Sequence, residues 1–167
     1  MKKLLTLSLV SITLLFSSFT SQTSNGGDYK CLIQLKNYSG KAAYVVVSIV
    51  DAKGEYQKTL RVLGDDKEWY PDIYSWYAHR EKVKHQPSID GVTGASIING
   101  GRNVVSFKID DKYINKGYSI RFETAVENME YYKDDVEVLL TDDNLKKGTF
   151  TAAKGYIRQV RLIPLAK

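Results

Sequence analysis

Apolar and polar residues alternate in short runs along most of this chain, and turn-forming residues separate the runs. Alternation with a period of two, rich in β-branched and aromatic residues, indicates half-buried strands. The pattern predicts seven strands, at residues 31–35, 42–50, 56–63, 104–109, 118–126, 136–140 and 156–163. Short strands at this spacing are typical of a mainly β fold, and we expect an antiparallel immunoglobulin-like β-sandwich.

One segment follows a helical period instead. Bulky residues recur there every three or four positions, which places them on one face of a helix. Pro71 suits a first helical turn, where its missing amide hydrogen costs nothing. We therefore expect a short aromatic helix within residues 69–85, inserted into the sandwich. Such a stripe usually packs on a sheet, and its rings can also line a ligand site. The residues on this face are Trp69, Ile73, Trp76 and Arg80.

The first residues have the composition of a secretory signal. Lys2 and Lys3 give a positive start, residues 4–16 are almost wholly apolar, and small residues follow. The apolar run is too short to span a bilayer as a helix, although a short anchor remains the alternative interpretation. We expect cleavage near Ser21. The predicted parts are a signal peptide (1–21), a polar tether (22–29) and one β-sandwich domain (30–167).

The charge pattern argues against nucleic acid as a partner. The formal net charge is +5, and Lys2 and Lys3 would leave with the signal. The other basic residues are interleaved with acidic pairs, so they form no basic stripe of the kind that nucleic-acid binding needs. The acidic pairs are Asp65-Asp66, Asp110-Asp111, Asp134-Asp135 and Asp142-Asp143.

The single cysteine, Cys31, excludes an internal disulfide. The residues before it, Asp28 to Lys30, do not form a small-residue lipidation box, so we expect Cys31 to be a small buried hydrophobe.

The spacing of the histidine, cysteine, acidic and nucleophilic residues does not match that of a metal site or a hydrolase active site. His79 and His85 are six positions apart, which suits no single helical face, and no further His or Cys lies nearby. No acidic loop has the alternating ligand spacing and closing Glu of a calcium site. No nucleophile has a base and an orienting partner. We expect no metal site and no catalytic residue in this chain.

A loop between the predicted helix and the next strand carries the most specific pattern. It reads Asp90-Gly91-Val92-Thr93-Gly94-Ala95-Ser96. This run resembles the D-x-x-[ST]-G-A-[ST] signature of proteins that receive covalent FMN from an ApbE-type flavin transferase. The resemblance implies that the transferase joins the FMN phosphate to the last hydroxyl, that of Ser96. Because short motifs also occur by chance, the alternative is that the loop is only a turn.

Several further segments agree with one family when taken in order. The chain resembles the predicted periplasmic domain of unknown function 2271 family from about residue 32 to about residue 160. The resemblance implies an immunoglobulin-type sandwich that works outside the cytosol, alongside flavin transferases and membrane flavoreductase or PepSY-type proteins. The segments are Tyr44, Gly54-Glu55-Tyr56-Gln57-Lys58-Thr59-Leu60, Trp69-Tyr70-Pro71-Asp72, Trp76, the 90–96 loop, Gly117-Tyr118 and Glu123-Thr124-Ala125-Val126-Glu127.

The motif suggests a role for each of its residues. Gly91, Gly94 and Ala95 keep the loop slim so that a transferase can approach closely. Asp90 offers a carboxylate to the transferase or its metal, and Thr93 fixes the shape of the loop by a hydrogen bond. Two features depart from the family: the loop usually ends in Thr, where this chain has Ser96, and the proline that commonly follows is absent.

A flavin on Ser96 would need ring and charge partners. Aromatic faces stack on flat rings, and cations stabilise a phosphate or an anionic reduced flavin. The aromatic candidates are Trp69, Tyr70, Trp76 and Tyr77, and the cations are Arg80, Lys82, Lys84 and Arg102, which otherwise form a solvated face. The leading expectation is therefore an extracytosolic electron carrier that is a substrate of the transferase. The alternative is a non-redox sandwich module for protein–protein interaction or assembly.

Overall fold

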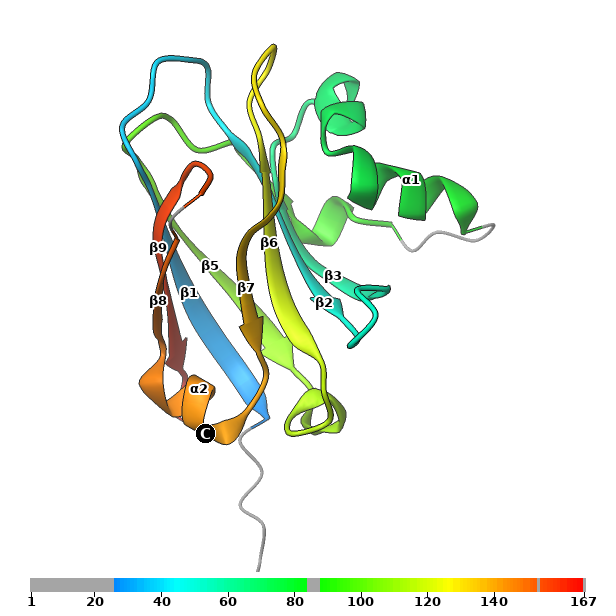
Figure 1. Cartoon of the computed structure of the whole chain (residues 1–167), viewed down its shortest axis with the longest axis vertical. Helices are drawn as coiled ribbons and strands as arrows, with labels where there is room; N and C mark the ends of the chain where they lie inside the picture. The colour runs from blue at the N-terminus through cyan, green and yellow to red at the C-terminus, as the bar shows by residue number, and fades with distance from the viewer. Residues whose placement is uncertain (1–25, 84–87, 153, 167) are drawn as a thin grey trace, which may run out of the picture.

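The fold consists mainly of two β-sheets, as predicted (Figure 1). The computed structural model describes residues 26–83, 88–152 and 154–166. One sheet has the strand order β5-β1-β9-β8, and the other has the order β4-β3-β2-β6-β7. All pairs are antiparallel except β3 and β4. The strands are β1 (Gly27–Leu35), β2 (Tyr44–Val50), β3 (Tyr56–Leu63), β4 (Thr93–Gly94), β5 (Arg102–Ile109), β6 (Ser119–Ala125), β7 (Tyr132–Leu139), β8 (Thr149–Thr151) and β9 (Ile157–Pro164).

All seven predicted strands are present, and β4 and β8 are additional. These two strands contain only two and three residues, too few to show an alternation. The predicted polar tether is too long, because β1 already begins at Gly27. Tyr29 is buried there, opposite Phe107 on β5 and Pro164 on β9. The predicted signal segment lies outside the described residues.

The main core lies between the two sheets. Alternate residues of β1, β5 and β9 meet alternate residues of β2, β6 and β7 there. Every residue of β2 and β6 is buried, which is unusual for strands of an antiparallel sheet. The uninterrupted run Val45-Val46-Val47 reflects this burial on both faces, because a second layer covers the outer face of the sheet.

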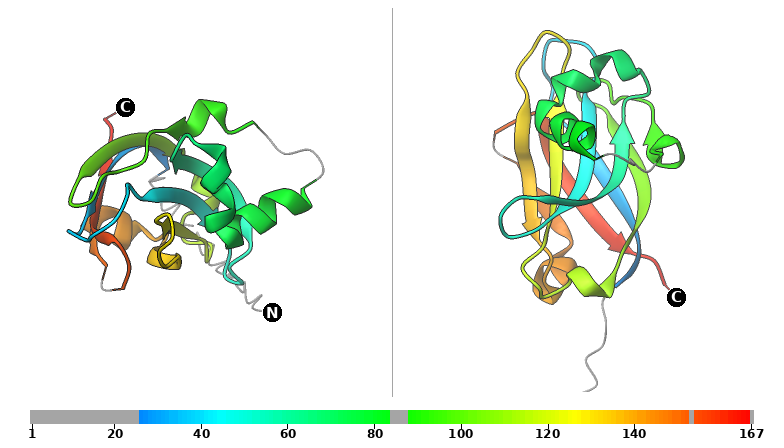
Figure 2. Two further views of the ribbon diagram at one scale, coloured as in Figure 1. Left: turned by 90° about the horizontal axis from the view of Figure 1, so that it is seen from above. Right: turned by 90° about the vertical axis from the view of Figure 1, so that its right-hand side faces the viewer.

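Helical segments form that second layer (Figure 2). The predicted single helix is divided into a 3-10 helix, η1 (Lys67–Asp72), and a helix, α1 (Tyr74–Lys82). Pro71 lies inside η1 and disfavours α-helical geometry at the residue before it, which explains the division. Ile73 and Trp76 are fully buried, as the helical face predicted, in a second cluster with Val46.

A buried carboxylate links the two sheets. Asp135 on β7 accepts hydrogen bonds from the Thr124 hydroxyl (2.7 Å) and from the amides of Ile157 (2.8 Å) and Gly155 (3.1 Å). Burial raises the pKa of Asp135, although these donors act in the opposite direction. A Cβ at Gly155 would lie 2.5 Å from the carboxylate, so glycine is required for this close approach.

Outside the 90–96 loop, the short helical elements α2 (Asp142–Lys147) and η3 (Asp111–Tyr113) were not predicted. The sequence contains the signals for α2, since Thr141 caps its N-terminus by accepting from the Asn144 amide, and Gly148 ends it with a φ of 67°. No helix within the described residues is long and apolar enough to cross a membrane.

Candidate functional site

The 90–96 loop lies where β3 leaves the sheet. Gly64 follows the last residue of β3 and has a φ of 140°, a conformation that side chains disfavour. A Cβ at Gly64 would lie only 1.9 Å from the Tyr44 ring. The Gly64 amide donates to the Gly94 carbonyl over 2.6 Å. The loop therefore continues the edge of the sheet from the point at which β3 turns away.

The first half of the loop is held by one carbonyl. Residues Asp90–Val92 form a 3-10 turn, η2, and the Ile89 carbonyl accepts from both the Val92 amide and the Thr93 hydroxyl at 2.8 Å. Ile89 itself is buried in the second cluster. The predicted loop hydrogen bond of Thr93 is thus present, and it ties the loop to the layer that contains α1.

The second half of the loop is a short span between two fixed points. Gly94 is held by Gly64 and by the parallel pairing of β4 with β3. Ile97 exchanges two backbone hydrogen bonds with Ala43, of 2.7 and 2.9 Å. Ala95 is exposed and Ser96 is partly exposed between these anchors. Within the described part of the chain, the Ser96 hydroxyl has no hydrogen-bond partner.

Asp90 is exposed at the start of the motif. Its carboxylate accepts from the Ser88 hydroxyl (3.0 Å) and lies 3.5 Å from the Lys67 ammonium. The hydrogen bond from Ser88 and then the charge of Lys67 lower the pKa of Asp90. The carboxylate is therefore ionised at neutral pH and available to a protein or a metal ion that approaches the loop.

The two motif glycines are not required by the packing of this chain. A Cβ at Gly91 would meet no atom within 4 Å, and one at Gly94 would be 3.6 Å from Leu63, an ordinary contact. Neither residue has a positive φ. The fold therefore leaves open space at Gly91 and would accommodate a Cβ at Gly94 without a clash.

The predicted aromatic partners lie mostly inside the second layer. Trp76 has no exposed surface, and its indole donates to the Thr59 hydroxyl over 3.0 Å. Trp69 and Tyr77 are partly buried against the same cluster, and the Lys41 ammonium lies 5.8 Å from the Trp69 ring centroid.

The predicted cations differ in position. The Arg80 guanidinium lies 5.4 Å from the Trp76 ring, whereas Lys82 and Arg102 are exposed. Lys84 and His85 lie outside the described residues.

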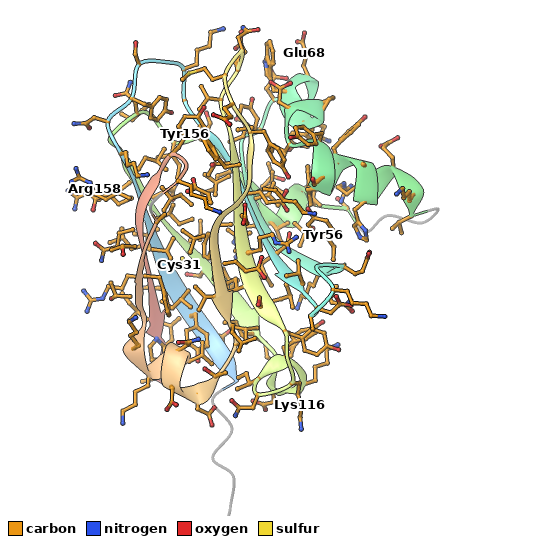
Figure 3. The ribbon with its side chains drawn as sticks, viewed as in Figure 1. Cys31, Tyr56, Glu68, Lys116, Tyr156 and Arg158 are labelled. Carbon is orange, nitrogen blue, oxygen red and sulfur yellow. The ribbon has the colours of Figure 1, made fainter. Side chains whose placement is uncertain are left out.

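A buried polar cluster on the outer face of the sheet was not predicted. Glu123 on β6 has no exposed surface and accepts hydrogen bonds from the hydroxyls of Tyr56 (2.6 Å) and Tyr131. Helix α1 rests on these two rings: His79 lies 4.9 Å from Tyr56 and Tyr74 lies 4.1 Å from Tyr131, measured between ring centroids. Figure 3 shows Tyr56 pointing from the sheet towards α1.

Burial dominates the electrostatics of this cluster. It raises the pKa of Glu123, against the opposing effects of the two tyrosine hydroxyls and Arg121. It also raises the pKa of Tyr56 and Tyr131, with Glu123 adding to the effect. A polar residue at this point of the strand pattern predicts an exposed side chain, so the sequence carried no signal for a buried one.

The described residues provide no alternative centre for metal or thiol chemistry. No group of three His, Cys, Asp or Glu side chains among them is arranged to hold a metal ion. Cys31 is buried in the main core, as predicted, and burial raises the pKa of its thiol to about 12. The 90–96 loop, in which the Ser96 hydroxyl has no hydrogen-bond partner among the described residues, is therefore the candidate site for covalent chemistry.

Comparison with known proteins supports the family resemblance described in the sequence analysis. A family described as "Predicted periplasmic protein (DUF2271)" matches residues 26–159, which include the whole loop and the strands around it. No curated protein and no solved structure matches the chain. Because the match covers most of the sequence, the chain belongs to this family of predicted periplasmic proteins.

Proposed function

We propose that this protein is an extracytosolic electron carrier with FMN attached covalently to Ser96. The observation that carries the proposal is the contrast between the two loop hydroxyls. Thr93 donates to the Ile89 carbonyl and is part of the loop's internal structure. Ser96 has no such partner among the described residues and lies between two clamped positions, Gly94 and Ile97. The loop therefore presents one hydroxyl in a fixed place.

The attachment is a phosphoryl transfer in which FAD is the co-substrate. A bond forms between Ser96 Oγ and the phosphorus of the FMN half, and the pyrophosphate bond to AMP breaks. The hydroxyl proton passes to a base of the transferase, and metal ions offset the charge on the phosphates. The part of this chain is to position the nucleophile, which lowers the entropic cost of the encounter.

The surroundings of the loop support approach by a second protein. Gly91 and Gly94 lack side chains although the fold has room for them, so the surface stays open there. The ionised Asp90 carboxylate is accessible beside this surface. An open backbone next to an accessible carboxylate suits a transferase that carries bound metal ions.

The cofactor would supply the redox chemistry, and the protein would supply orientation and electrostatics. The family description supports a periplasmic or secreted setting, reached after signal cleavage near Ser21. A membrane flavoreductase or PepSY-type protein would be the electron donor. We also infer an immunoglobulin-type sandwich architecture, supported by the two sheets that share one core, although here β1 and β2 lie in different sheets.

The test is co-expression of the full-length chain with a flavin transferase in a host that exports it. Intact mass spectrometry should show the mature protein heavier by one FMN less one water. Ser96→Ala should abolish this gain, whereas Ser39→Ala, a control at an exposed serine, should retain it. An unmodified wild-type mass, beside a known flavin acceptor labelled in the same host, would overturn the proposal. The protein would then be better explained as a partner-binding module.

A further inference from the structure

A hollow of about 290 Å³ lies directly beside the 90–96 loop, between β4 and β5. We refer to it as the loop hollow. Its walls include Arg61 of β3, the loop residues Gly91 and Gly94, and three residues of β5, Asn103, Val104 and Ser106. Gly94 is two residues from Ser96, which corresponds to at most about 7 Å of extended chain. A group tethered to Ser96 would therefore begin at the rim of this hollow.

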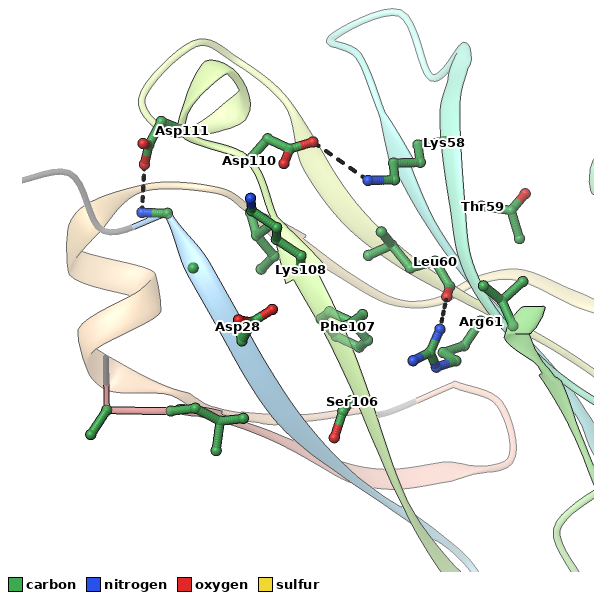
Figure 4. A pocket seen from close by; sticks show the side chains of 16 residues that line it. Asp28, Lys58, Thr59, Leu60, Arg61, Ser106, Phe107, Lys108, Asp110 and Asp111 are labelled. Atoms are coloured by element: carbon green, nitrogen blue, oxygen red, sulfur yellow. Dashed lines mark hydrogen bonds and ion pairs between the residues drawn. The ribbon is translucent and has the colours of Figure 1, made fainter. Parts of the chain in front are cut away.

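A larger cleft of about 880 Å³ continues from the loop hollow along the edges of β3 and β5 (Figure 4). We refer to it as the edge cleft. The two spaces share Arg61, Val92 and Ser106, so they adjoin. Their volumes lie near and within the range of small-molecule sites. The edge strands β3 and β5 thus frame one continuous trough that starts at the loop.

Arg61 is the cation that lines both spaces. Its guanidinium is partly buried and donates one hydrogen bond, to the Leu60 carbonyl at 2.9 Å. Within residues 26–83, 88–152 and 154–166, no carboxylate forms an ion pair with it. Lys58, deeper in the edge cleft, is paired with Asp110 at 3.4 Å. A partly buried guanidinium without a carboxylate partner favours an anionic ligand.

We propose that the isoalloxazine ring of FMN on Ser96 lies in the loop hollow, where Arg61 stabilises its reduced, anionic form. This proposal rests on the proposed function. Two electrons and one proton convert the oxidised ring to this anion, and a nearby cation favours the product because the added charge is attracted to it. The side-chain amide of Asn103, which lies on the same face of β5 as the buried Val105, offers hydrogen bonds to the polar edge of the ring.

Charge and burial favour the loop hollow over the other places near Ser96. The deeper edge cleft is lined by Lys58 and Lys108 as well as by the carboxylates of Asp28, Asp110 and Asp111, so its charges offset one another. In the loop hollow, by contrast, the charged lining residue is Arg61. Trp76, an aromatic candidate from the sequence, has no exposed face on which the ring could stack. The end of the trough beside Arg61 therefore offers a cation, hydrogen-bonding groups and a short tether together.

The first test is a redox titration of the purified flavinylated protein, after intact mass has confirmed one FMN per chain. Arg61→Gln should disfavour reduction at least tenfold, which lowers a two-electron midpoint potential by about 30 mV. Arg61→Lys should keep most of the wild-type potential. Arg158→Gln, the same charge loss at an exposed position of β9, should leave it unchanged. An equal potential for Arg61→Gln and Arg158→Gln would overturn the proposal, because it would show that Arg61 does not bias reduction of the flavin.

A second measurement keeps the proposal testable if Arg61→Gln does not fold. Val104 is 56 % exposed and lines the loop hollow, so Val104→Trp should fill the space without disturbing the core. In Val104→Trp, acrylamide should quench the flavin fluorescence as strongly as it does in a flavinylated peptide of residues 88–99. In wild type and in the control Leu139→Trp, the flavin should be protected from quenching. Wild-type quenching equal to that of the peptide would contradict the proposal. A protein without flavin would instead contradict the proposed function, and the initial mass measurement separates the two cases.

Discussion

The Gly64 amide donates a hydrogen bond to the Gly94 carbonyl over 2.6 Å, and this contact joins the end of β3 to the 90–96 loop. It forms because Gly64 adopts a φ of 140° directly against the Tyr44 ring. Tyr44 and Gly64 thus set the position of Gly94, and the Ile97–Ala43 pairing sets the other end of the span. The place of the Ser96 hydroxyl is therefore a consequence of how β3 ends.

Gly64→Ala should destabilise the protein by about 3 kcal/mol, since it combines backbone strain with a clash against a buried ring. Urea unfolding measures the difference. Gly91→Ala is the matched control, because its Cβ would meet no atom within 4 Å. That variant should stay within about 0.5 kcal/mol of wild type. Equal stability of the two variants would show that Tyr44 does not hold Gly64 in this way.

The buried Glu123 makes stability depend on pH in a direction opposite to that of an ordinary ion-paired carboxylate. Burial raises its pKa above the usual 4.5, so the folded state binds the proton more tightly than the unfolded chain. The contribution to stability is therefore full below pH 4.5 and is lost as the pH rises through the folded pKa. Glu123→Gln should remove this loss, so its stability relative to wild type should increase with pH across that window.

Thermal unfolding between pH 4 and pH 8 tests this prediction. The buried Asp135 makes stability depend on pH in the same direction in both proteins. The slope of stability against pH should therefore be smaller for Glu123→Gln than for wild type, but not zero. Glu68→Gln, at an exposed position of η1, should follow the wild-type curve. Parallel curves for wild type and Glu123→Gln would show that Glu123 does not titrate as a buried group.

Sequence patterns predicted the strands well, but they did not predict which strand residues are buried by elements distant in the sequence. The strand at 56–63 is confirmed at both ends because its alternation and the Asp51–Gly54 turn are local signals. Glu123 carries no such signal, since its burial depends on α1 covering the outer face of a sheet. The same coverage explains why Trp76 is entirely internal. The 90–96 pattern drew attention to the loop, but its position depends on pairings with β3 and Ala43 that no local pattern encodes.

Cys31 should be unreactive in the folded protein. The thiolate is the nucleophile, and burial raises the pKa of this thiol to about 12, so almost none is ionised at pH 8. Iodoacetamide at pH 8 should leave the native protein unmodified and add one label in urea. Rapid labelling of the native protein would contradict the burial of Cys31 in the core between the two sheets.

The most direct test of the central claim is peptide mapping of the flavinylated protein by tandem mass spectrometry. Fragments that separate Thr93 from Ser96 locate the added phosphoester without any substitution in the loop. The proposed function predicts FMN on Ser96 alone, because the Thr93 hydroxyl is bound to the Ile89 carbonyl. FMN on Thr93, or on any residue outside the loop, would contradict this account of the acceptor site.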